Sequence, residues 1–180
     1  MTLPIPDKLC QDVPIFAGLN AGECRQLADI ATVQSFVPGE ILVEQGGMSR
    51  TFWILLEGTC EVIRKLDEST SLDEAVILAV LAPNTHFGEM SFFRPAPHSA
   101  SVRAKTAGRA MRIARIDYDD LIRDGVWGAY KLAYNVTQTL ADRLRRMDEW
   151  IGELMAHRPP AECDGEWTKF REKLFTEWNL

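Results

Sequence analysis

The sequence predicts a mostly β fold with flanking helices, in which a sandwich or barrel with Greek-key or jelly-roll wiring precedes a long C-terminal helix. Two observations lead to this class. Between about residues 31 and 116, short runs rich in β-branched and aromatic residues alternate with turn signals such as Pro38-Gly39 and Gly46-Gly47. From about 125 to 156, apolar residues recur instead at helical spacing, which indicates one long helix.

The individual elements follow in order along the chain. A short amphipathic helix over 20–30 begins with Asn20 and Glu23, which form a capping-box pattern. The polar segment from Leu66 to Glu74 is expected to be a hairpin loop, and Asp117 is expected to cap the helix after the last strand. Strands are expected near 32–37, 40–45, 51–57, 59–64, 76–81, 100–104 and 109–115.

The composition is that of a soluble globular protein. The chain has 180 residues, of which 46% are hydrophobic, and its 20 basic and 26 acidic side chains give a net charge of −6. This acidic balance argues against DNA and anionic membranes as partners. The longest apolar run, from Ala75 to Ala82, has 8 residues, whereas a membrane span needs roughly 20. The N-terminus shows no signal-peptide pattern, so we expect a cytoplasmic protein.

The sequence carries no pattern of an enzyme or of a metal site. The common nucleophile, zinc-protease and nucleotide-phosphate motifs are absent. No metal-ligand spacing links the three histidines, which are His86, His98 and His157. We therefore expect no catalysis, no metal and no cofactor. The four cysteines lie far apart and form no C-x-x-C pair, so we expect reduced thiols at Cys10, Cys24, Cys60 and Cys163.

The long helix has the heptad spacing of a coiled-coil seam. Its apolar residues alternate at intervals of three and four, as a and d positions do. Polar residues occupy most of the remaining surface, so the seam is narrow and favours a homodimer, although the helix could instead pack on its own barrel. Tyr130 and Thr137 belong to the repeat, and the expected dimerisation residues are Ala133, Leu140, Leu144, Met147, Ile151 and Leu154.

One further short helix is expected over 164–180, with Asp164 as its cap. Its aromatic stripe is a packing face or a docking site for another protein, and comprises Trp167, Phe170, Leu174 and Trp178.

The segment from His86 to Thr106 holds the candidate binding residues. Gly88, Glu89, Met90 and Ser91 could form one helical turn whose free N–H groups point at an anion. His98 and Ser99 could close over the same anion, while the Glu89 carboxylate accepts hydrogen bonds from sugar hydroxyls. Amides, a hydroxyl and a carboxylate together suit a ribose phosphate.

The ordered glycines and the segment around Glu89 carry a resemblance that covers about residues 12–156. Its motifs are Phe16-Ala17-Gly18-Leu19, Gly39, Gly46, Phe52-Trp53-Ile54, Gly58, Phe87-Gly88-Glu89-Met90-Ser91 and Ser99 to Thr106. In these the chain resembles the cyclic nucleotide-binding domain family, which includes the bacterial cyclic-AMP receptor, fumarate and nitrate regulators, kinase regulatory subunits and gated channels. The resemblance implies a jelly-roll-like double-stranded β-helix, a β-roll, flanked by helices.

The resemblance also implies the roles of the site residues. Glu89 falls where the family's glutamate binds the ribose 2′-hydroxyl, and Ser99 with the amides around Met90 and Ser91 falls at phosphate-contacting positions. At position 98 the family's pattern has arginine, but this chain has His98, whose unperturbed pKa of about 6.5 leaves it only partly charged at neutral pH. We therefore expect an altered phosphate site.

These expectations combine into one interpretation. The chain would be a non-enzymatic cytoplasmic sensory or regulatory module, binding a cyclic nucleotide or a related anion, and the alternative is a ligand-free structural or protein-interaction module. Only a short tail follows the long helix, so we expect no DNA-reading domain. The expected domains are the β-roll with its N-terminal helix (1–124), the dimerisation helix (125–158) and the C-terminal helix (159–180).

Overall fold

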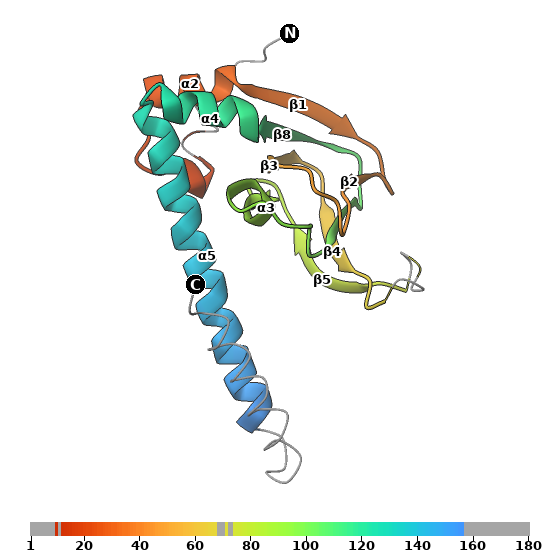
Figure 1. The fold of residues 1–180 in the computed structure, drawn as a ribbon. Helices are drawn as coiled ribbons and strands as arrows, with labels where there is room; N and C mark the ends of the chain where they lie inside the picture. Colours follow the sequence, from red (N-terminus) through yellow and green to blue (C-terminus); the bar gives the residue numbers. More distant parts are fainter. Residues whose placement is uncertain (1–9, 11, 68–70, 72–73, 157–180) are drawn as a thin grey trace. The chain divides into compact units, whose positions relative to one another are not determined.

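The computed structural model describes residues 10, 12–67, 71 and 74–156. The chain divides into two compact units, residues 1–136 and 137–180. In chain order (Figure 1), the elements are η1 (Pro14–Phe16), α2 (Ala21–Asp29), β1 (Ala31–Phe36), β2 (Ile41–Val43), β3 (Thr51–Glu57), β4 (Cys60–Arg64), β5 (Val76–Leu81), β6 (His86–Phe87), α3 (Glu89–Phe93), β7 (Ser101–Ala104), β8 (Gly108–Ala114), α4 (Arg115–Arg123) and α5 (Trp127–Ala156).

The strands of the described chain form two four-stranded antiparallel sheets. One has the order β1-β8-β3-β6 and the other has the order β2-β7-β4-β5, so neighbouring strands come from distant parts of the sequence. This interleaving is the jelly-roll-like wiring that the sequence predicts, and the fold class is confirmed. Strands of both sheets contribute to one apolar core, whose buried residues are Phe36, Val43, Trp53, Leu55, Cys60, Leu81, Phe87, Val102, Ala104 and Ala110.

The strand predictions are confirmed with two adjustments. β2 ends at Val43 rather than at 45, because Glu44 begins a turn in which the Gly47 N–H donates to the Glu44 carbonyl oxygen at 3.1 Å. The sequence does not predict β6, because a strand of two residues is too short to show an alternating pattern.

The helix starts agree with the sequence at α2 but not at α4. The Asn20 side chain accepts from the Glu23 N–H at 2.9 Å, and the Glu23 carboxylate accepts from the Asn20 N–H at 2.8 Å, so the predicted capping box is present. The prediction that Asp117 caps α4 is wrong. β8 runs directly into α4, Ala114 is the N-cap, and Asp117 lies in the first turn, where its negative charge favours the helix N-terminus.

The expectation of reduced thiols is wrong for two of the four cysteines. Cys10 and Cys24 form a disulfide bond, with their Cα atoms 6.2 Å apart. Sequence spacing alone does not reveal this pairing, because the two cysteines are 14 positions apart and only the fold brings their Cα atoms to a separation that suits a disulfide. Cys60 is a free, buried thiol, while Cys163 and the expected helix over 164–180 lie outside the described residues.

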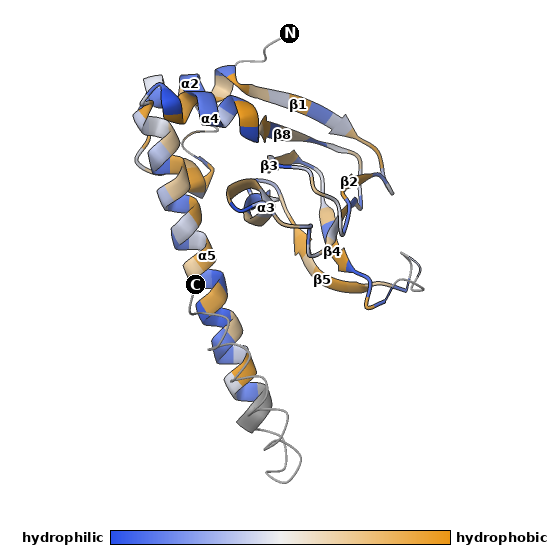
Figure 2. Cartoon of the chain, in the orientation of Figure 1, coloured by the Kyte–Doolittle hydropathy of each residue, from blue (hydrophilic) through white to orange (hydrophobic). Residues whose placement is uncertain are grey.

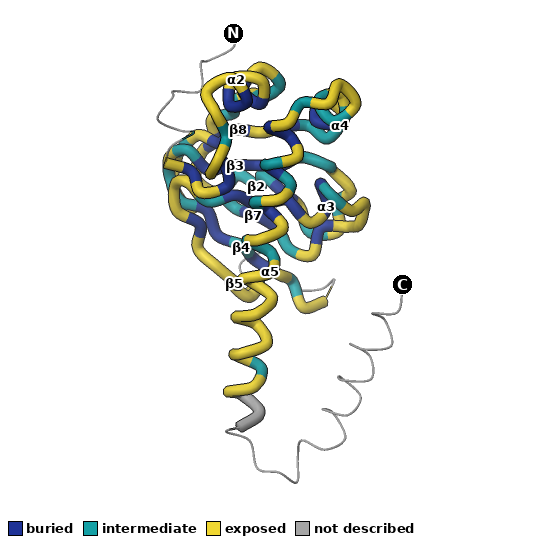
Figure 3. Tube along the Cα trace, turned by 90° about the vertical axis from the view of Figure 1, so that its left-hand side faces the viewer, coloured by how far each residue is buried: buried dark blue, intermediate teal, exposed yellow. Residues whose placement is uncertain are grey.

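The character of α5 changes along its length. In its first turns, residues at intervals of three and four positions form one fully buried face. They are Ala129, Leu132 and Val136. This part of α5 therefore packs within the first unit. From residue 137 to residue 153 every side chain is exposed or half-buried (Figure 3). None of the helices in the described part of the chain combines the length and hydropathy that a membrane span requires.

Candidate functional site

A tight turn between β6 and α3 positions the first half of the candidate site. β6 pairs with β3, and Gly88 follows β6 as the N-cap of α3. Gly88 has φ of +80°, and a Cβ atom at this position would lie 2.6 Å from the Thr51 carbonyl oxygen. Only glycine meets both demands, so this turn requires the Gly88 that the sequence motif contains.

Aromatic packing anchors α3 to the β-roll and to α4. Phe92 is fully buried, and its ring lies 5.6 Å from that of Phe52 and 5.1 Å from that of Tyr118, measured between centroids. The Arg50 and Arg115 side chains each donate to the Phe92 carbonyl oxygen at 3.1 Å. The Arg115 guanidinium also lies 5.4 Å from the centre of the Phe92 ring, at cation–π distance. A displacement of α3 would therefore disturb the start of α4.

The predicted binding residues of α3 differ in their exposure. The Glu89 and Ser91 side chains are buried, with 4% and 3% of their surface exposed, whereas Met90 is 61% exposed. The first turn of α3 contains Met90 and Ser91, the two residues whose amides the sequence places at an anion.

His98 is held in place by hydrogen bonds on both its ring and its backbone. Its Nε2 atom lies 2.8 Å from the Ser49 hydroxyl oxygen, and 6% of the residue's surface is exposed. The His98 N–H donates to the Gly47 carbonyl oxygen at 2.9 Å, and the Gly46 N–H donates to the His98 carbonyl oxygen at 2.8 Å. Burial lowers the pKa of His98 below 6.5, and the hydrogen bond with Ser49 only partly opposes this. The imidazole is therefore neutral at pH 7.

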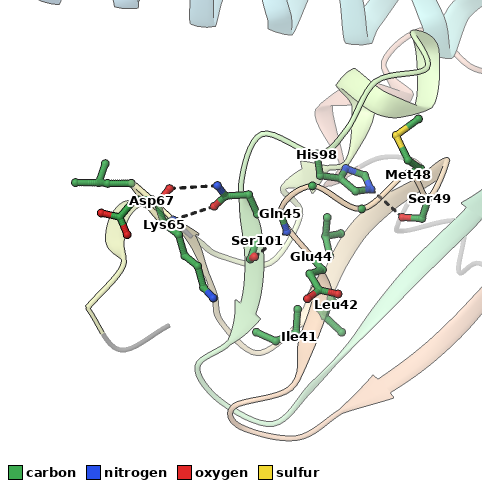
Figure 4. Close-up of a pocket in the computed structure, with 14 residues that line it drawn as sticks. Ile41, Leu42, Glu44, Gln45, Met48, Ser49, Lys65, Asp67, His98 and Ser101 are labelled. Carbon is green, nitrogen blue, oxygen red and sulfur yellow. Dashed lines mark hydrogen bonds between the residues drawn. The ribbon is translucent and has the colours of Figure 1, made fainter. Parts of the chain in front are cut away.

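A cavity of about 870 Å³ lies beside His98 (Figure 4). Its walls come from β2, the 44–49 loop, the 65–67 segment, His98 and Ser101. The loop is held by Gln45, whose N–H donates to the Ser101 hydroxyl at 2.9 Å and whose side chain bonds the backbone of Lys65. With His98 neutral, two carboxylates and one ammonium group line the cavity, so the charge of its walls is −1 at pH 7 (Glu44, Asp67 and Lys65).

The structure brings only part of the predicted site to this cavity. Fourteen described residues line it, and His98 is the only predicted binding residue among them. Gly88, Glu89, Met90 and Ser91 lie on the α3 turn, and Ser99 is exposed beside His98. Ser49 and Gln45 are not predicted from the sequence, because they precede His98 by about fifty positions. The Gly46-Gly47 turn was the one signal that pointed to this loop.

Comparison with known proteins identifies a family for this fold. A family model described as "Cyclic nucleotide-binding domain" matches residues 33–124. The cAMP-dependent protein kinase regulatory subunit of Yarrowia lipolytica is 28% identical over 116 residues, which cover 64% of this chain and 29% of the relative. The chain thus spans less than a third of that relative's length.

Two solved structures are similar over most of the chain. The catabolite activator protein of Thermus thermophilus has 27% sequence identity and a TM-score of 0.68, and the match covers 79% of this chain and 63% of that one. The regulatory subunit of a cAMP-independent protein kinase A from Trypanosoma cruzi, solved bound to guanosine, has 26% identity and a TM-score of 0.56. That match covers 74% of this chain and 48% of the other.

Proposed function

Because this chain belongs to the cyclic nucleotide-binding domain family, we propose that it is a non-enzymatic regulatory module for a cyclic nucleotide or a related anionic small molecule, with an altered phosphate site. The family match supports the ligand class, and the observation that supports the altered phosphate site is His98. A neutral imidazole stands at the position where the family's pattern has arginine, beside a cavity whose walls carry a net negative charge. We place the module in the cytoplasm.

The ligand would occupy the α3 turn and the region near His98. Glu89 would accept hydrogen bonds from the ribose hydroxyls, while Gly88, the amides of Met90 and Ser91, and the Ser99 hydroxyl would contact the phosphate. A neutral imidazole donates at most one hydrogen bond, whereas arginine offers a charged, planar pair of donors. We therefore expect weak binding of cyclic nucleotides at neutral pH.

The contacts of α3 suggest how a ligand would act on the rest of the chain. Phe92, at the end of α3, touches Tyr118 and accepts hydrogen bonds from Arg115, and both partners belong to α4. The Tyr118 hydroxyl in turn donates to the Ala129 carbonyl oxygen of α5 at 2.8 Å. A ligand that favours one position of α3 would thereby bias α4 and the start of α5.

We further propose that α5 joins two copies into a homodimer. With Tyr130 as an a position, the large exposed apolar residues of the described part of α5 all lie at a, d, e or g positions: Trp127, Tyr130, Tyr134, Leu144, Met147 and Trp150. The expected d position Leu140 and a position Ile151 are half-buried, as is Ala133, while the side chain of Leu154 lies outside the described residues.

Introducing charge into the seam tests the dimer. Leu140→Asp with Leu144→Asp should give a folded monomer, because burying each such side chain contributes roughly 1.5–3 kcal/mol. The matched control is Gln138→Asp with Arg145→Gln, which changes the net charge equally but lies outside the seam. Analytical ultracentrifugation should show wild type and control as dimers at micromolar concentration. A monomeric wild type would contradict the proposal.

A ligand panel tests the binding function. The melting temperature of the protein is measured with cyclic AMP, cyclic GMP, adenosine and guanosine, since a ligand that binds the folded state raises it. The nucleosides test whether the phosphate contributes at all, as guanosine occupies the trypanosomal relative. We expect stabilisation by a cyclic nucleotide that is larger at acidic pH. Stabilisation by the nucleosides alone would contradict the anionic ligand class.

A second candidate function is a ligand-free protein-interaction module. It is favoured by β5, an edge strand whose side chains are apolar and exposed over five consecutive residues, Val76–Val80 (Figure 2). Exposed apolar strands at a sheet edge are typical of interaction sites. No stabilisation by any member of the panel would favour this candidate over the first.

A further inference from the structure

The disulfide between Cys10 and Cys24 lies outside the candidate binding site and has no part in the proposed function. It closes a segment with a sequence separation of 14 and attaches the N-terminal end of the described chain to α2. Cys24 is 6% exposed, whereas Cys10 is only half-buried. A thiolate from outside can therefore reach the bond from the Cys10 side.

The segment that the disulfide fixes is also the one that holds the first turns of α5. Glu23, the neighbour of Cys24, is 8% exposed and accepts two hydrogen bonds from the Lys131 ammonium group, at 2.8 and 2.9 Å. Hydrogen bonds from Lys131 and from the Asn20 backbone lower the pKa of the Glu23 carboxyl, so this ion pair is charged at neutral pH. Lys131 also donates to the Gly18 carbonyl oxygen at 2.9 Å.

Two further contacts tie the same surfaces together. The Asn135 side chain donates to the carbonyl oxygens of Ile15 and Ala17 at 2.8 and 2.9 Å. Gly128 allows the backbones of α2 and α5 to approach, since a Cβ atom there would lie 2.8 Å from the Glu23 Cβ. Residues 12–29 thus carry one cysteine of the disulfide and also contact residues 128–135 of α5. All of these residues belong to the first unit.

We propose that the Cys10–Cys24 pair is a redox switch that sets how firmly residues 12–29 hold the first turns of α5. In the reducing step, a dithiol reductant attacks the Cys10 sulfur and Cys24 leaves as a thiolate that takes up a proton. The second thiol of the reductant then resolves the mixed disulfide, so two cysteine thiols form while the reductant is oxidised to its own disulfide. A disulfide of low-molecular-weight thiols reverses the reaction.

The remaining thiol of the described chain does not compete in this exchange. Burial raises the pKa of the Cys60 thiol to about 11, so it stays protonated at neutral pH, and it is fully buried. Thiol–disulfide exchange requires an accessible thiolate, which Cys60 does not supply. A switch rather than a permanent staple also agrees with the proposed cytoplasmic location, on which this one argument rests, because disulfides in reducing compartments are usually transient or redox-sensing.

Hydrogen exchange of the full chain tests the switch. The protein, in a Cys163→Ser background, is compared after equilibration with oxidised or with reduced dithiothreitol, and alkylation under denaturing conditions with mass spectrometry counts the free thiols. We expect two more alkylated cysteines after reduction, faster amide exchange in residues 12–29 and 127–136, and unchanged exchange in β3 and β8. The melting temperature should fall by roughly 5–10 °C, as expected for a short closed loop.

Cys10→Ser provides the control, because the half-exposed position tolerates the hydroxyl. This variant should show the fast exchange of the reduced protein under both conditions. Equal exchange at 127–136 in oxidised and reduced wild type would overturn the switch, as would faster exchange spread evenly over the β-roll. A count of three free thiols under oxidising conditions would show that the disulfide does not form. None of these readouts depends on a nucleotide, so they are independent of the proposed binding function.

Discussion

The α3 turn and the cavity wall formed by the 44–49 loop and His98 lie in the same β-roll. They differ in the contacts that fix them and in how far their function depends on charge. The turn is fixed by backbone constraints at Gly88 and by the buried ring of Phe92, which also lies at cation–π distance from the Arg115 guanidinium. The wall is held by hydrogen bonds, among them those of Gln45 with Ser101 and of His98 with Ser49, and its charge depends on His98, which burial keeps neutral. Packing preserves the shape of a site independently of its ligand chemistry, so a single substitution can change the ligand while the fold stays intact.

The largest effect on stability is expected at the α3 turn. Phe92→Ala should lower the free energy of unfolding by about 3–5 kcal/mol, because it removes a fully buried ring and leaves a cavity. The matched control on the same helix is Met90→Ala, which changes an exposed side chain and should alter stability by less than about 0.5 kcal/mol. Urea unfolding measures both. Equal losses in the two variants would show that α3 is not fixed by Phe92.

The contact between Glu89 and the ribose is expected to affect the affinity for cyclic AMP only after His98 has been replaced by arginine. In a His98→Arg background, Glu89→Ala should weaken cyclic AMP binding by about 1.5–3 kcal/mol, the range for hydrogen bonds to a charged group. Fluorescence competition with a labelled cyclic nucleotide measures the loss, and circular dichroism verifies that the buried position tolerates alanine. Unchanged affinity would remove Glu89 from the site.

The burial of a neutral imidazole at His98 predicts how the free energy of unfolding depends on pH. The folded protein lowers the pKa of His98 below its value of 6.5 in the unfolded chain, so below that value the unfolded state binds more protons. The stability that this neutral histidine contributes is present above pH 6.5 and is lost as the pH falls through the lowered pKa. Wild type should therefore lose more stability than His98→Gln between about pH 8 and pH 5 in urea titrations. Parallel curves would contradict the burial of a neutral imidazole.

The smallest effect is expected where α4 meets α5. Tyr118→Phe removes one buried hydrogen bond, from the hydroxyl to the Ala129 carbonyl oxygen, and should cost about 0.5–1.5 kcal/mol. Thermal unfolding should show this loss, while Tyr130→Phe, whose hydroxyl makes a more exposed bond to the Ile122 carbonyl oxygen, should cost less. The reverse order would mean that Tyr118 contributes little to the link between the two helices.

The sequence predicts those features that depend on local spacing. The strands, the Asn20–Glu23 capping box and the glycine turn at Gly88 are all confirmed, because each follows from residues within a few positions of one another. Contacts between distant segments escape this reasoning. The bond between Ser49 and His98 spans 49 positions, and the Cys10–Cys24 disulfide joins residues 14 positions apart.

Position 98 shows a second limit of sequence reasoning. The sequence identifies a histidine in place of arginine, but the charge of that histidine depends on its burial, which only the fold supplies. An exposed imidazole would be partly protonated at neutral pH, whereas the buried one is not. The sequence therefore predicts that a histidine at this position alters the phosphate site. It does not predict whether the pKa of that histidine is raised or lowered.

The most direct test of the account is isothermal titration of wild type and His98→Arg with cyclic AMP and cyclic GMP, at acidic and at neutral pH. A bound anion raises the histidine pKa, so wild type should bind best at acidic pH and lose affinity as the pH rises through the pKa of the complex. His98→Arg should bind more tightly by about 1.5–3 kcal/mol at neutral pH and show little pH dependence, while His98→Gln should gain nothing. If His98→Arg gains no affinity either, the missing charge is not what limits binding, and the interaction module replaces the cyclic nucleotide site.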